Sequence, residues 1–254
     1  MTGIDRPAIG IVTGLAFEAN SLKRHLPEPQ AFTIALSGGD AARALSEARR
    51  LIREGACGLL SFGTAGALAP ALAPGNVIVA TEVITASGGS LAAERAWCDA
   101  LAAAGSARGL PPQLGALRAV DQPVASAEAK SVLYRSCGAL AVDMESGAVA
   151  RAARDAGLPF AVLRVVIDAA GRDLPPAAMA AMAPGGGIDA GGLARELWRQ
   201  PRQIGGLLCL ARDAAVARRA LGRAAARLAP SVFVEMVASA VSTCFSNTYS
   251  AGRA

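Results

Sequence analysis

Short runs of apolar residues recur along the first 170 residues and alternate with stretches of helical periodicity. The runs contain few polar positions, which is typical of strands that are buried on both faces of a sheet. The predicted strands are residues 8–13, 31–36, 57–62, 76–84, 139–143 and 160–167. The clearest predicted helices between them are residues 17–26 and 40–54. This alternation predicts an α/β fold of three layers (αβα), with helices on both faces of a mostly parallel central sheet.

Polar residues and glycines gather where these predicted strands end. In open sheets of this class, ligands bind at the carboxyl ends of the strands. The segments that follow strands and carry glycines or carboxylates are Gly14–Glu18, Gly63–Leu68, Asp143–Ser146 and Asp168. We therefore expect these segments to form the functional site.

Beyond residue 170 the pattern changes. Residues 170–192 are rich in Pro and Gly, and we expect a loop with one short helix. The following segment has a helical composition interrupted near Pro201 and Gly205-Gly206, with leucine and alanine on one face and arginine on another. The last residues shift to Val, Ser, Thr and aromatic types. The predicted units are an α/β domain (1–192), a basic amphipathic helical extension (193–228) and a tail of unknown structure (229–254).

Composition favours a folded protein of a reducing compartment. Of the 254 residues, 53% are hydrophobic and 18% are charged, which allows a large core. The apolar runs are shorter than the roughly 20 residues of a transmembrane helix. The apolar stretch 8–17 is broken by glycines and stops at Glu18, unlike a signal peptide. The five cysteines are scattered without a Cys-x-x-Cys pair, so we expect reduced thiols and a cytoplasmic protein.

The same inventory argues against several kinds of site. The single histidine, His25, lies near the end of the first predicted helix, where a solvated role is usual. Neither a His-ligated metal nor a Ser-His-Asp triad is therefore expected. No Gly-x-Gly-x-x-Gly sequence opens a helix and no P-loop is present, which argues against a dinucleotide-dependent dehydrogenase. We expect neither a metal nor a cofactor.

Four motifs in consistent order carry a resemblance to a known family. They are Gly10–Glu18, Gly63-Thr-Ala-Gly-Ala-Leu68 with Pro74-Gly-Asn-Val-Ile-Val79, Val142-Asp-Met-Glu-Ser146 and Arg164-Val-Val-Ile-Asp168. The last three are similar to the patterns G-[ST]-A-G-G-L…G-D-[IV]-V, [VE]-x-M-E-[ASG] and R-x-[IV]-S-D. Over roughly residues 8–170 the chain resembles the nucleoside phosphorylase superfamily, and within it the 5'-methylthioadenosine/S-adenosylhomocysteine nucleosidases.

Two further segments resemble the hopanoid-associated branch of this superfamily. They are the D-x-A-x-R-x-L-P-P-A-A run at 168–178 and the arginine-rich extension at 199–214. Members of that branch remove adenine from adenosylhopane during assembly of hopanoid lipids. The resemblance therefore implies cleavage of the N-glycosidic bond of an adenine nucleoside that is attached to a lipid.

The resemblance also implies roles for the carboxylates. The reaction passes through an oxocarbenium-like ribosyl cation, and adenine needs a proton in order to leave. Asp168 would provide it at N7, because a partly desolvated carboxyl can hold a proton near neutrality. Glu145 would accept hydrogen bonds from the ribose 2'- and 3'-hydroxyls, Met144 would pack on the sugar and Glu18 would activate water. The alternatives are a helix cap for Asp168, a core position for Met144 and a first-turn residue for Glu18.

The remaining implied contacts come from backbone and apolar groups. Gly63, Thr64 and Gly66 would let N–H groups and a hydroxyl approach the sugar, water or an anion. Val124 would line the base, in a segment where Pro123 replaces an aromatic residue usual in the family. A second departure is Ile167, which stands beside Asp168 where the family has Ser or Thr.

The basic charge is concentrated in one segment. Residues 193–228 hold eight arginines against Glu196 and Asp213, whereas the whole chain has a net charge of +5. An arginine-striped helix suits an anionic membrane surface, and the alternative is an ordinary surface helix. Nucleic acid is not an expected partner, because Trp198 is the only aromatic residue in the segment. The expected partners are a lipid-linked or small adenine nucleoside, the inner face of the cytoplasmic membrane and a second copy in a homodimer.

Three other functions stay open. The first is a phosphorylase with inorganic phosphate as co-substrate; Glu18 argues against it, because phosphate prefers neutral or basic surroundings. The second is a methylthioadenosine/S-adenosylhomocysteine nucleosidase. The third is a non-enzymatic, membrane-attached module that binds nucleosides, which the departures at Ile167 and Pro123 permit.

Overall fold

The computed structural model describes residues 9–26, 32–106, 111–181, 187, 189–228, 232 and 235–240. Within these ranges eight strands belong to one sheet. The strands are β1 (Ile9–Thr13), β2 (Phe32–Leu36), β3 (Leu59–Ala67), β4 (Val77–Ile84), β5 (Ser90–Ala92), β6 (Gln113–Ala119), β7 (Ala141–Asp143) and β8 (Phe160–Asp168). The α-helices are α1 (Ala16–Lys23), α2 (Ala41–Arg53), α3 (Arg95–Ser106), α4 (Ala127–Cys137), α5 (Ser146–Asp155), α6 (Pro176–Ala180), α7 (Ala190–Arg199) and α8 (Ile204–Arg227).

The sheet is mixed and partly closed on itself. Strands β1, β2, β3 and β8 form one group, in which neighbouring strands are parallel. Strands β4, β6 and β7 form a second group, in which neighbouring strands are also parallel. The two groups meet through antiparallel pairs of β3 with β7 and of β4 with β8. Strands β3, β7, β6, β4 and β8 therefore pair in a ring, and β1 and β2 extend it from β3. The antiparallel pairs bring the end of β3 beside β7, which places Gly66 opposite Val142.

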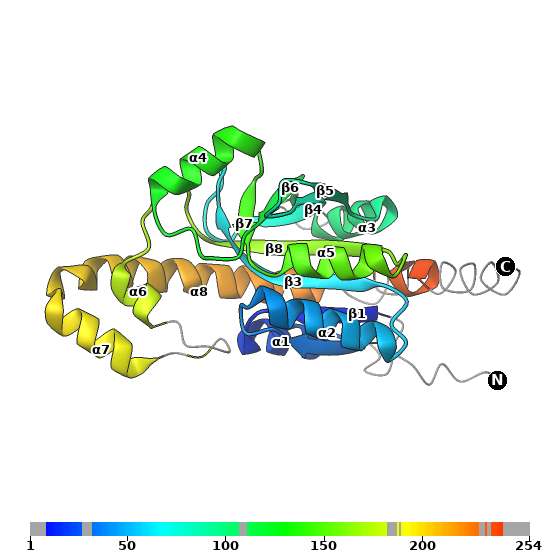
Figure 1. The fold of residues 1–254 in the computed structure, drawn as a ribbon, viewed down its shortest axis with the longest axis horizontal. Coiled ribbons are helices and arrows are strands. Elements are labelled where there is room, and N and C mark those ends of the chain that lie inside the picture. The colour runs from blue at the N-terminus through cyan, green and yellow to red at the C-terminus, as the bar shows by residue number, and fades with distance from the viewer. Residues whose placement is uncertain are drawn as a thin grey trace, which may run out of the picture.

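Helices cover the sheet on two faces, as the strand pattern predicted (Figure 1). Alanines of α2 and α5, including Ala48 and Ala152, pack into one hydrophobic core with the strands. Residues of α1, α3 and the second half of α8 form the other core, which includes Leu22, Trp97 and Leu221. Small side chains let the helices approach the strands closely, so an alanine-rich sequence still gives a dense interior. The predicted three-layer α/β fold is confirmed.

The C-terminal segment projects beyond the sheet and then returns to it. Helix α8 runs through Gly205 and Gly206 without interruption, so the predicted break there is wrong. The chain turns instead at Pro201, in a short 3₁₀ helix. A Cβ atom at Gly206 would lie 3.0 Å from the ring of Pro175, so the glycine permits close packing against the segment after β8. Further along α8, alanines face the sheet and are buried, at Ala217, Ala220, Ala224 and Ala225.

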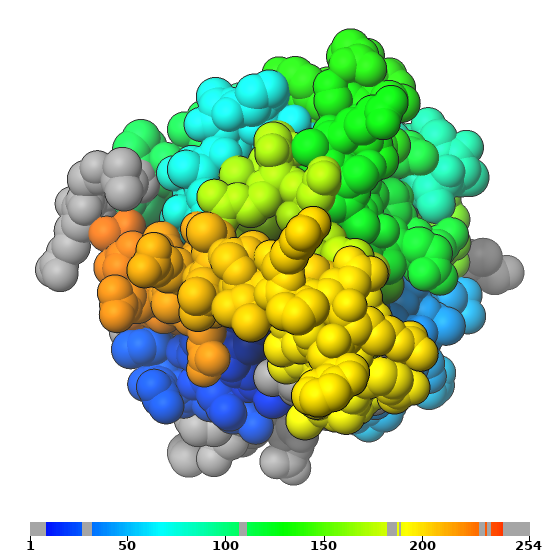
Figure 2. Space-filling view, turned by 90° about the vertical axis from the view of Figure 1, so that its left-hand side faces the viewer, coloured from blue at the N-terminus to red at the C-terminus, as the bar shows by residue number. Residues whose placement is uncertain are grey.

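Helices α6 and α7 and the first half of α8 lie at the end of the molecule where β8 ends (Figures 1 and 2). Two contacts fasten them there: the Arg172 guanidinium pairs with Asp213 of α8, and the Ala177 N–H donates to Gln203 at 2.7 Å. In the part of the chain that the structure describes, no helix is long and apolar enough to cross a bilayer. Most of the 229–254 tail lies outside the described residues, although the described Met236 is buried in the α8 core.

Candidate active site

Glu18 lies in the first turn of α1 and connects two neighbouring strands. One carboxylate oxygen accepts the N–H groups of Gly14 and Leu15, both at 2.9 Å. The other accepts the N–H and the hydroxyl of Thr64 on β3, both at 2.8 Å. Burial raises the pKa of Glu18, although Arg164 and the hydrogen bonds from Leu15 and Thr64 lower it. The four donors hold the carboxylate rigidly between the start of α1 and β3.

Arg164 places a buried cation at the centre of the site. Its guanidinium lies within β8 and is 1% exposed. It donates to Asp143 at 2.6 Å and to the hydroxyl of Ser61 at 2.7 Å, and it lies 3.6 Å from Glu145. Asp143 also accepts the hydroxyl of Ser146 at 2.5 Å. Asp143 is therefore the principal ionic partner of Arg164, a role that the motif left open.

Glu145 is buried beside Glu18, and its carboxylate lies 3.6 Å from the Arg164 guanidinium. A Cβ atom at Gly14 would lie 2.5 Å from one Glu145 oxygen and 3.4 Å from a Glu18 oxygen, so both carboxylates converge on this glycine. Burial raises the pKa of Glu145 to about 8; Arg164 opposes this increase, and Asp143 and Glu18 add to it. Burial, together with a single guanidinium facing three acids, thus favours the protonated form of Glu145.

Asp168 ends β8 and forms a buried ion pair with Lys130 of α4. The Lys130 ammonium also donates to the carbonyl oxygens of Ala169 at 3.1 Å and Arg172 at 2.9 Å. The carboxyl also faces β3, since a Cβ atom at Gly66 would lie 3.2 Å from Oδ1 and 3.3 Å from Oδ2. Burial raises the pKa of Asp168, and the Lys130 charge and hydrogen bond oppose this increase.

Strand β3 brings the predicted residues together. Gly63 faces the Glu18 carboxylate, where a Cβ atom would lie 2.7 Å from an oxygen, and Thr64 donates to the same group. Gly66 faces Asp168. Glu18 and Asp168 therefore lie along one short stretch of β3, and Glu145 meets Glu18 at Gly14, although the three residues are far apart in the sequence. Glycines at 63 and 66 allow these carboxyls to approach the backbone without a steric clash.

Met144 and Val124 occupy different surroundings. Met144 is half-buried and lines a hollow of about 330 Å³, together with Thr85, Ala119, Gly147 and Arg151 among others. Val124 is half-buried and packs against the apolar cluster around Leu68 and Val142. The structure therefore places Met144 at a hollow that Glu18, Glu145 and Asp168 do not line, and Val124 beside the ends of β3 and β7.

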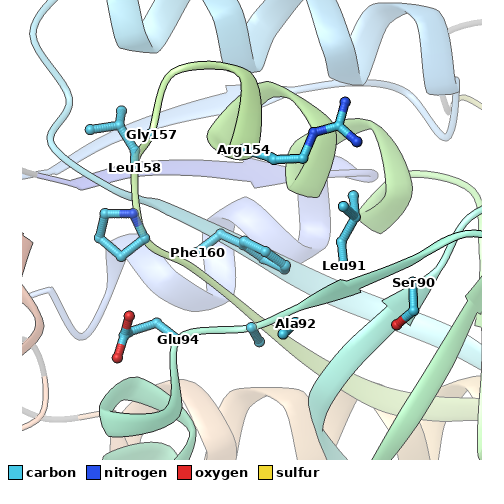
Figure 3. Close-up of a pocket in the computed structure, with 10 residues that line it drawn as sticks. Ser90, Leu91, Ala92, Glu94, Arg154, Gly157, Leu158 and Phe160 are labelled. Carbon is cyan, nitrogen blue, oxygen red and sulfur yellow. The ribbon is translucent and has the colours of Figure 1, made fainter.

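Another hollow, of about 520 Å³, lies away from these residues (Figure 3). It is bordered by residues 90–94 and 157–160 and by Arg154. Phe160 starts β8 and Asp168 ends it, so this hollow lies at the opposite end of the strand from the carboxylates. None of the residues predicted for the site borders it. Among the described residues, no group of His, Cys, Asp and Glu side chains has an arrangement suited to a metal ion.

The sequence interpretation missed two basic residues of the site. Arg164 interrupts an otherwise apolar strand, and a charge in such a run is a sign of a buried ion pair. Lys130 gave no comparable sign, because α4 mixes polar and apolar residues and a lysine among them is usually exposed. Each basic residue is paired with a carboxylate at the end of a strand.

The chain belongs to the phosphorylase superfamily, whose profile matches residues 30–183. This match confirms the superfamily that the sequence motifs predicted and, with it, an enzyme of that class. A comparison with curated proteins gives no match.

Solved structures of nucleosidases share the fold. The 5'-methylthioadenosine/S-adenosylhomocysteine nucleosidase of Neisseria meningitidis, in complex with methylthio-immucillin-A, is similar with a TM-score of 0.63 and 20% identity, over 86% of this chain and 97% of that one. The futalosine hydrolase of Helicobacter pylori is similar with a TM-score of 0.61 and 19% identity, over 76% of this chain and 98% of that one. The S-adenosylhomocysteine nucleosidase of Streptococcus pyogenes, in complex with 5-methylthiotubericidin, is similar with a TM-score of 0.61 and 20% identity, over 80% of this chain and 99% of that one.

The raised pKa of Glu145 predicts how stability changes with pH. Between its ordinary value of 4.5 and about 8, the folded protein holds a proton on Glu145 that the unfolded chain releases. The free energy of unfolding therefore falls as pH rises through this range. Glu145→Gln keeps the neutral shape, so its Tm should decrease less than that of the wild type between about pH 5 and pH 9.

Glu128→Gln, at an exposed position of α4, is the control and should follow the wild-type Tm at every pH. Thermal unfolding measured by circular dichroism across the pH series tests this expectation. Parallel curves for the wild type and Glu145→Gln would contradict it.

Proposed function

We propose that the protein cleaves the N-glycosidic bond of an adenine nucleoside. The observation that carries this proposal is the meeting of the Glu18 and Glu145 carboxylates at Gly14. Glu18 also reaches β3, and Asp168 faces the same strand. The similar structures add support, because two of them contain methylthio-immucillin-A and 5-methylthiotubericidin. Departure of adenine requires an acid at the base and negative charge beside the ribosyl cation, and this cluster holds both kinds of group.

Each carboxylate takes the role for which its surroundings suit it. Asp168 protonates adenine at N7, and burial, which raises the pKa of its carboxyl, favours the protonated form that this step needs. Glu145 binds the ribose hydroxyls and Met144 packs on the sugar. Glu18 activates the nucleophile. At Gly63, Thr64 and Gly66 the backbone of β3 approaches the sugar or the water closely. Val124 borders the base.

We propose water as the nucleophile. Glu18, Asp143 and Glu145 face a single guanidinium, so the region opposes a phosphate dianion. Protein donors fill the acceptor sites of Glu18, and a water molecule would reach it by replacing the Thr64 hydroxyl, whose side chain can rotate. Phosphorolysis, with inorganic phosphate as co-substrate, is the second candidate, because the chain belongs to the phosphorylase superfamily.

We propose adenosylhopane as the substrate, on the basis of the resemblance of segments 168–178 and 199–214 to the hopanoid-associated branch. The structure adds an exposed apolar surface at the turn between α7 and α8, formed by Trp198 (89% exposed), Leu208 (60%) and Ile204 (50%). Helix α7 and the start of α8 lie at the end of the molecule where β8 ends (Figure 2). A lipid-linked nucleoside would thus have apolar protein surface at the same end of the molecule as Asp168.

The test is incubation of the purified protein with adenosylhopane or methylthioadenosine, each with and without inorganic phosphate. We expect adenine from adenosylhopane without phosphate, and a free ribosyl product by mass spectrometry. A ribosyl phosphate would establish phosphorolysis, and cleavage of methylthioadenosine alone would assign a small soluble substrate. No adenine from either substrate would overturn the proposed function.

We propose that the turn between α7 and α8 binds the surface of an anionic bilayer, at the inner face of the cytoplasmic membrane. The exposed charged residues from 193 to 212 are arginines, at positions 195, 199, 202 and 212. The acidic residues nearby are engaged, Glu196 with Gln203 and Asp213 with Arg172. Basic residues near anionic headgroups contribute about 1 kcal/mol each, and an exposed Trp favours the interface. Further along α8, Arg218 stacks on Phe17, whereas Arg219 and Arg223 are exposed.

Trp198 provides the readout for this contact, because the other tryptophan, Trp97, is buried. We expect a blue shift of Trp198 fluorescence and co-sedimentation with phosphatidylcholine vesicles that contain about one third phosphatidylglycerol. Trp198→Ala and Leu208→Ser should bind less, whereas Val132→Ser, which changes an exposed residue of α4, should bind as the wild type does. Absence of binding to the anionic vesicles would contradict the proposal, and a concentration-dependent dimer that Trp198→Ala abolishes would assign the surface to a second copy.

A further inference from the structure

Lys130 is a buried amine with all of its hydrogen-bonding capacity in use. It is 1% exposed and is the one buried residue of α4. Its three acceptors are a carboxylate oxygen of Asp168 and the carbonyl oxygens of Ala169 and Arg172. An ammonium has three N–H donors, whereas a neutral amine has two and would leave one acceptor unfilled. Each of the three N–H donors of the Lys130 ammonium therefore has an acceptor.

The contact with Asp168 is made through one carboxyl oxygen only. Lys130 donates to Oδ2 alone, whereas a Cβ atom at Gly66 would lie close to both oxygens, 3.2 Å from Oδ1 and 3.3 Å from Oδ2. Among the described residues, Oδ1 has no hydrogen-bond donor within reach. Because Lys130 fixes the carboxyl plane, Oδ1 is the atom left to exchange a proton with a ligand.

We propose that Lys130 is the positioning residue of the acid: it holds Oδ2 of Asp168 and stabilises the carboxylate that remains after Oδ1 has passed its proton to adenine. This inference rests on the proposed function and adds to it the residue that makes Asp168 an effective acid. Lys130 itself touches neither adenine nor ribose in this scheme.

The proton balance of the step is complete. As the bond between ribose and adenine breaks, its electron pair goes to adenine and the proton on Oδ1 moves to N7. Water adds to the ribosyl cation and gives its proton to Glu18. Asp168 is then a carboxylate paired with the Lys130 ammonium, and it recovers a proton from solvent while Glu18 releases one. Lys130 stays charged throughout.

The groups around Asp168 favour this division of roles. Burial raises the pKa of the Asp168 carboxyl, which favours the protonated form before reaction. The opposing influence comes mainly from Lys130, with a smaller one from Arg172, while Asp213 acts in the same direction as burial. An apolar neighbour in place of Lys130 would leave the carboxylate product buried without a cation, which is costly.

The competing explanation is that Lys130 only fastens the segment after β8. It binds two carbonyls there, and Asp173 adds another link by accepting the N–H of Ala127 at 2.7 Å. A purely structural role needs hydrogen-bond donors, whereas the proposed role needs a positive charge. Lys130→Gln keeps donors without the charge, and Lys130→Arg keeps the charge.

The test is the pH dependence of kcat and kcat/KM for adenine release. An opposite charge within a few ångströms lowers the pKa of an aspartate by about 1–3 units. The alkaline limb of the pH–rate profile reports loss of the Asp168 proton. In Lys130→Gln this limb should therefore shift to a pH about 1–3 units higher. We expect a lower kcat near neutrality with little change in KM, while Lys130→Arg should keep the wild-type alkaline limb. The other lysine of the chain, the exposed Lys23, provides the control Lys23→Gln, which should match the wild type.

Two results would overturn the inference: a wild-type alkaline limb in folded Lys130→Gln, or the same shift in Lys130→Arg as in Lys130→Gln. If Lys130→Gln does not fold, Lys130→Met in the presence of methylammonium replaces it. Recovery of activity by the added cation supports the inference, and no recovery in the folded variant contradicts it. Failure of the proposed function is distinguishable, because adenine release by the wild type would then be absent or independent of Asp168.

Discussion

Asp168→Asn should lower kcat for adenine release by about 10²–10⁴-fold, the usual contribution of a positioned acid. Asparagine keeps the size of the side chain and can still accept a hydrogen bond from Lys130, but it has no carboxyl proton to give to N7. KM should change much less than kcat, since the carboxylates that face the ribose are unchanged. Steady-state kinetics with liquid-chromatographic detection of adenine measures the effect.

Asp155→Asn is the matched control, because Asp155 ends α5 at the surface and pairs with Arg154. It should leave both constants at the wild-type values. Wild-type kcat in Asp168→Asn would remove Asp168 from the reaction. If neither the wild type nor the variant releases adenine but both bind nucleoside, the non-enzymatic binding module is the better description.

Arg164→Met should destabilise the protein by about 3–5 kcal/mol, because it leaves buried carboxylates without their cation. Asp143 would lose its close partner and Glu145 its nearest positive charge, while the apolar stem of methionine fills part of the space. For a chain of this size, such a loss corresponds to a decrease in Tm of about 10 °C. Differential scanning calorimetry and urea unfolding measure it.

Arg154→Met provides the comparison, since the Arg154 guanidinium is 59% exposed. A surface ion pair contributes about 0–1 kcal/mol, so the Tm of this variant should stay close to that of the wild type. Equal stability of Arg164→Met and the wild type would show that the buried cation does not balance the acids. The pH dependence of any loss is informative, because low pH protonates the same acids and reduces their need for Arg164.

Much of the fold could be predicted from local patterns. The apolar run 160–167 corresponds to β8 and the run 76–84 to β4, since a strand buried on both faces needs apolar residues at almost every position. Strand β6 was not predicted, because its sequence QLGALRA carries polar or small residues at several positions and is only partly buried. Ring closure through β3–β7 and β4–β8 could not be predicted either, since antiparallel pairing between distant strands leaves no local signal.

The division of the C-terminal region stays a prediction, and the structure shows what a helical pattern alone does not reveal. Leucines, alanines and arginines along 193–228 predicted an amphipathic helix. Which parts of its apolar face meet protein depends on the neighbours: Leu221 is buried on the sheet, whereas Leu208 is 60% exposed beyond it. The same apolar periodicity therefore packs into a core in the second half of α8 and forms an exposed surface in its first half.

The sequence by itself determined which acids stand at the ends of strands, because Glu18, Glu145 and Asp168 follow apolar runs or a motif that local pattern reveals. Only the tertiary structure decided the charge that each acid meets. Lys130 reaches Asp168 across 38 positions of the chain, and Arg164 reaches Asp143 across 21. The protonation of a buried carboxyl depends on its desolvation and on charges within a few ångströms, and both are properties of the folded chain rather than of neighbouring residues in the sequence.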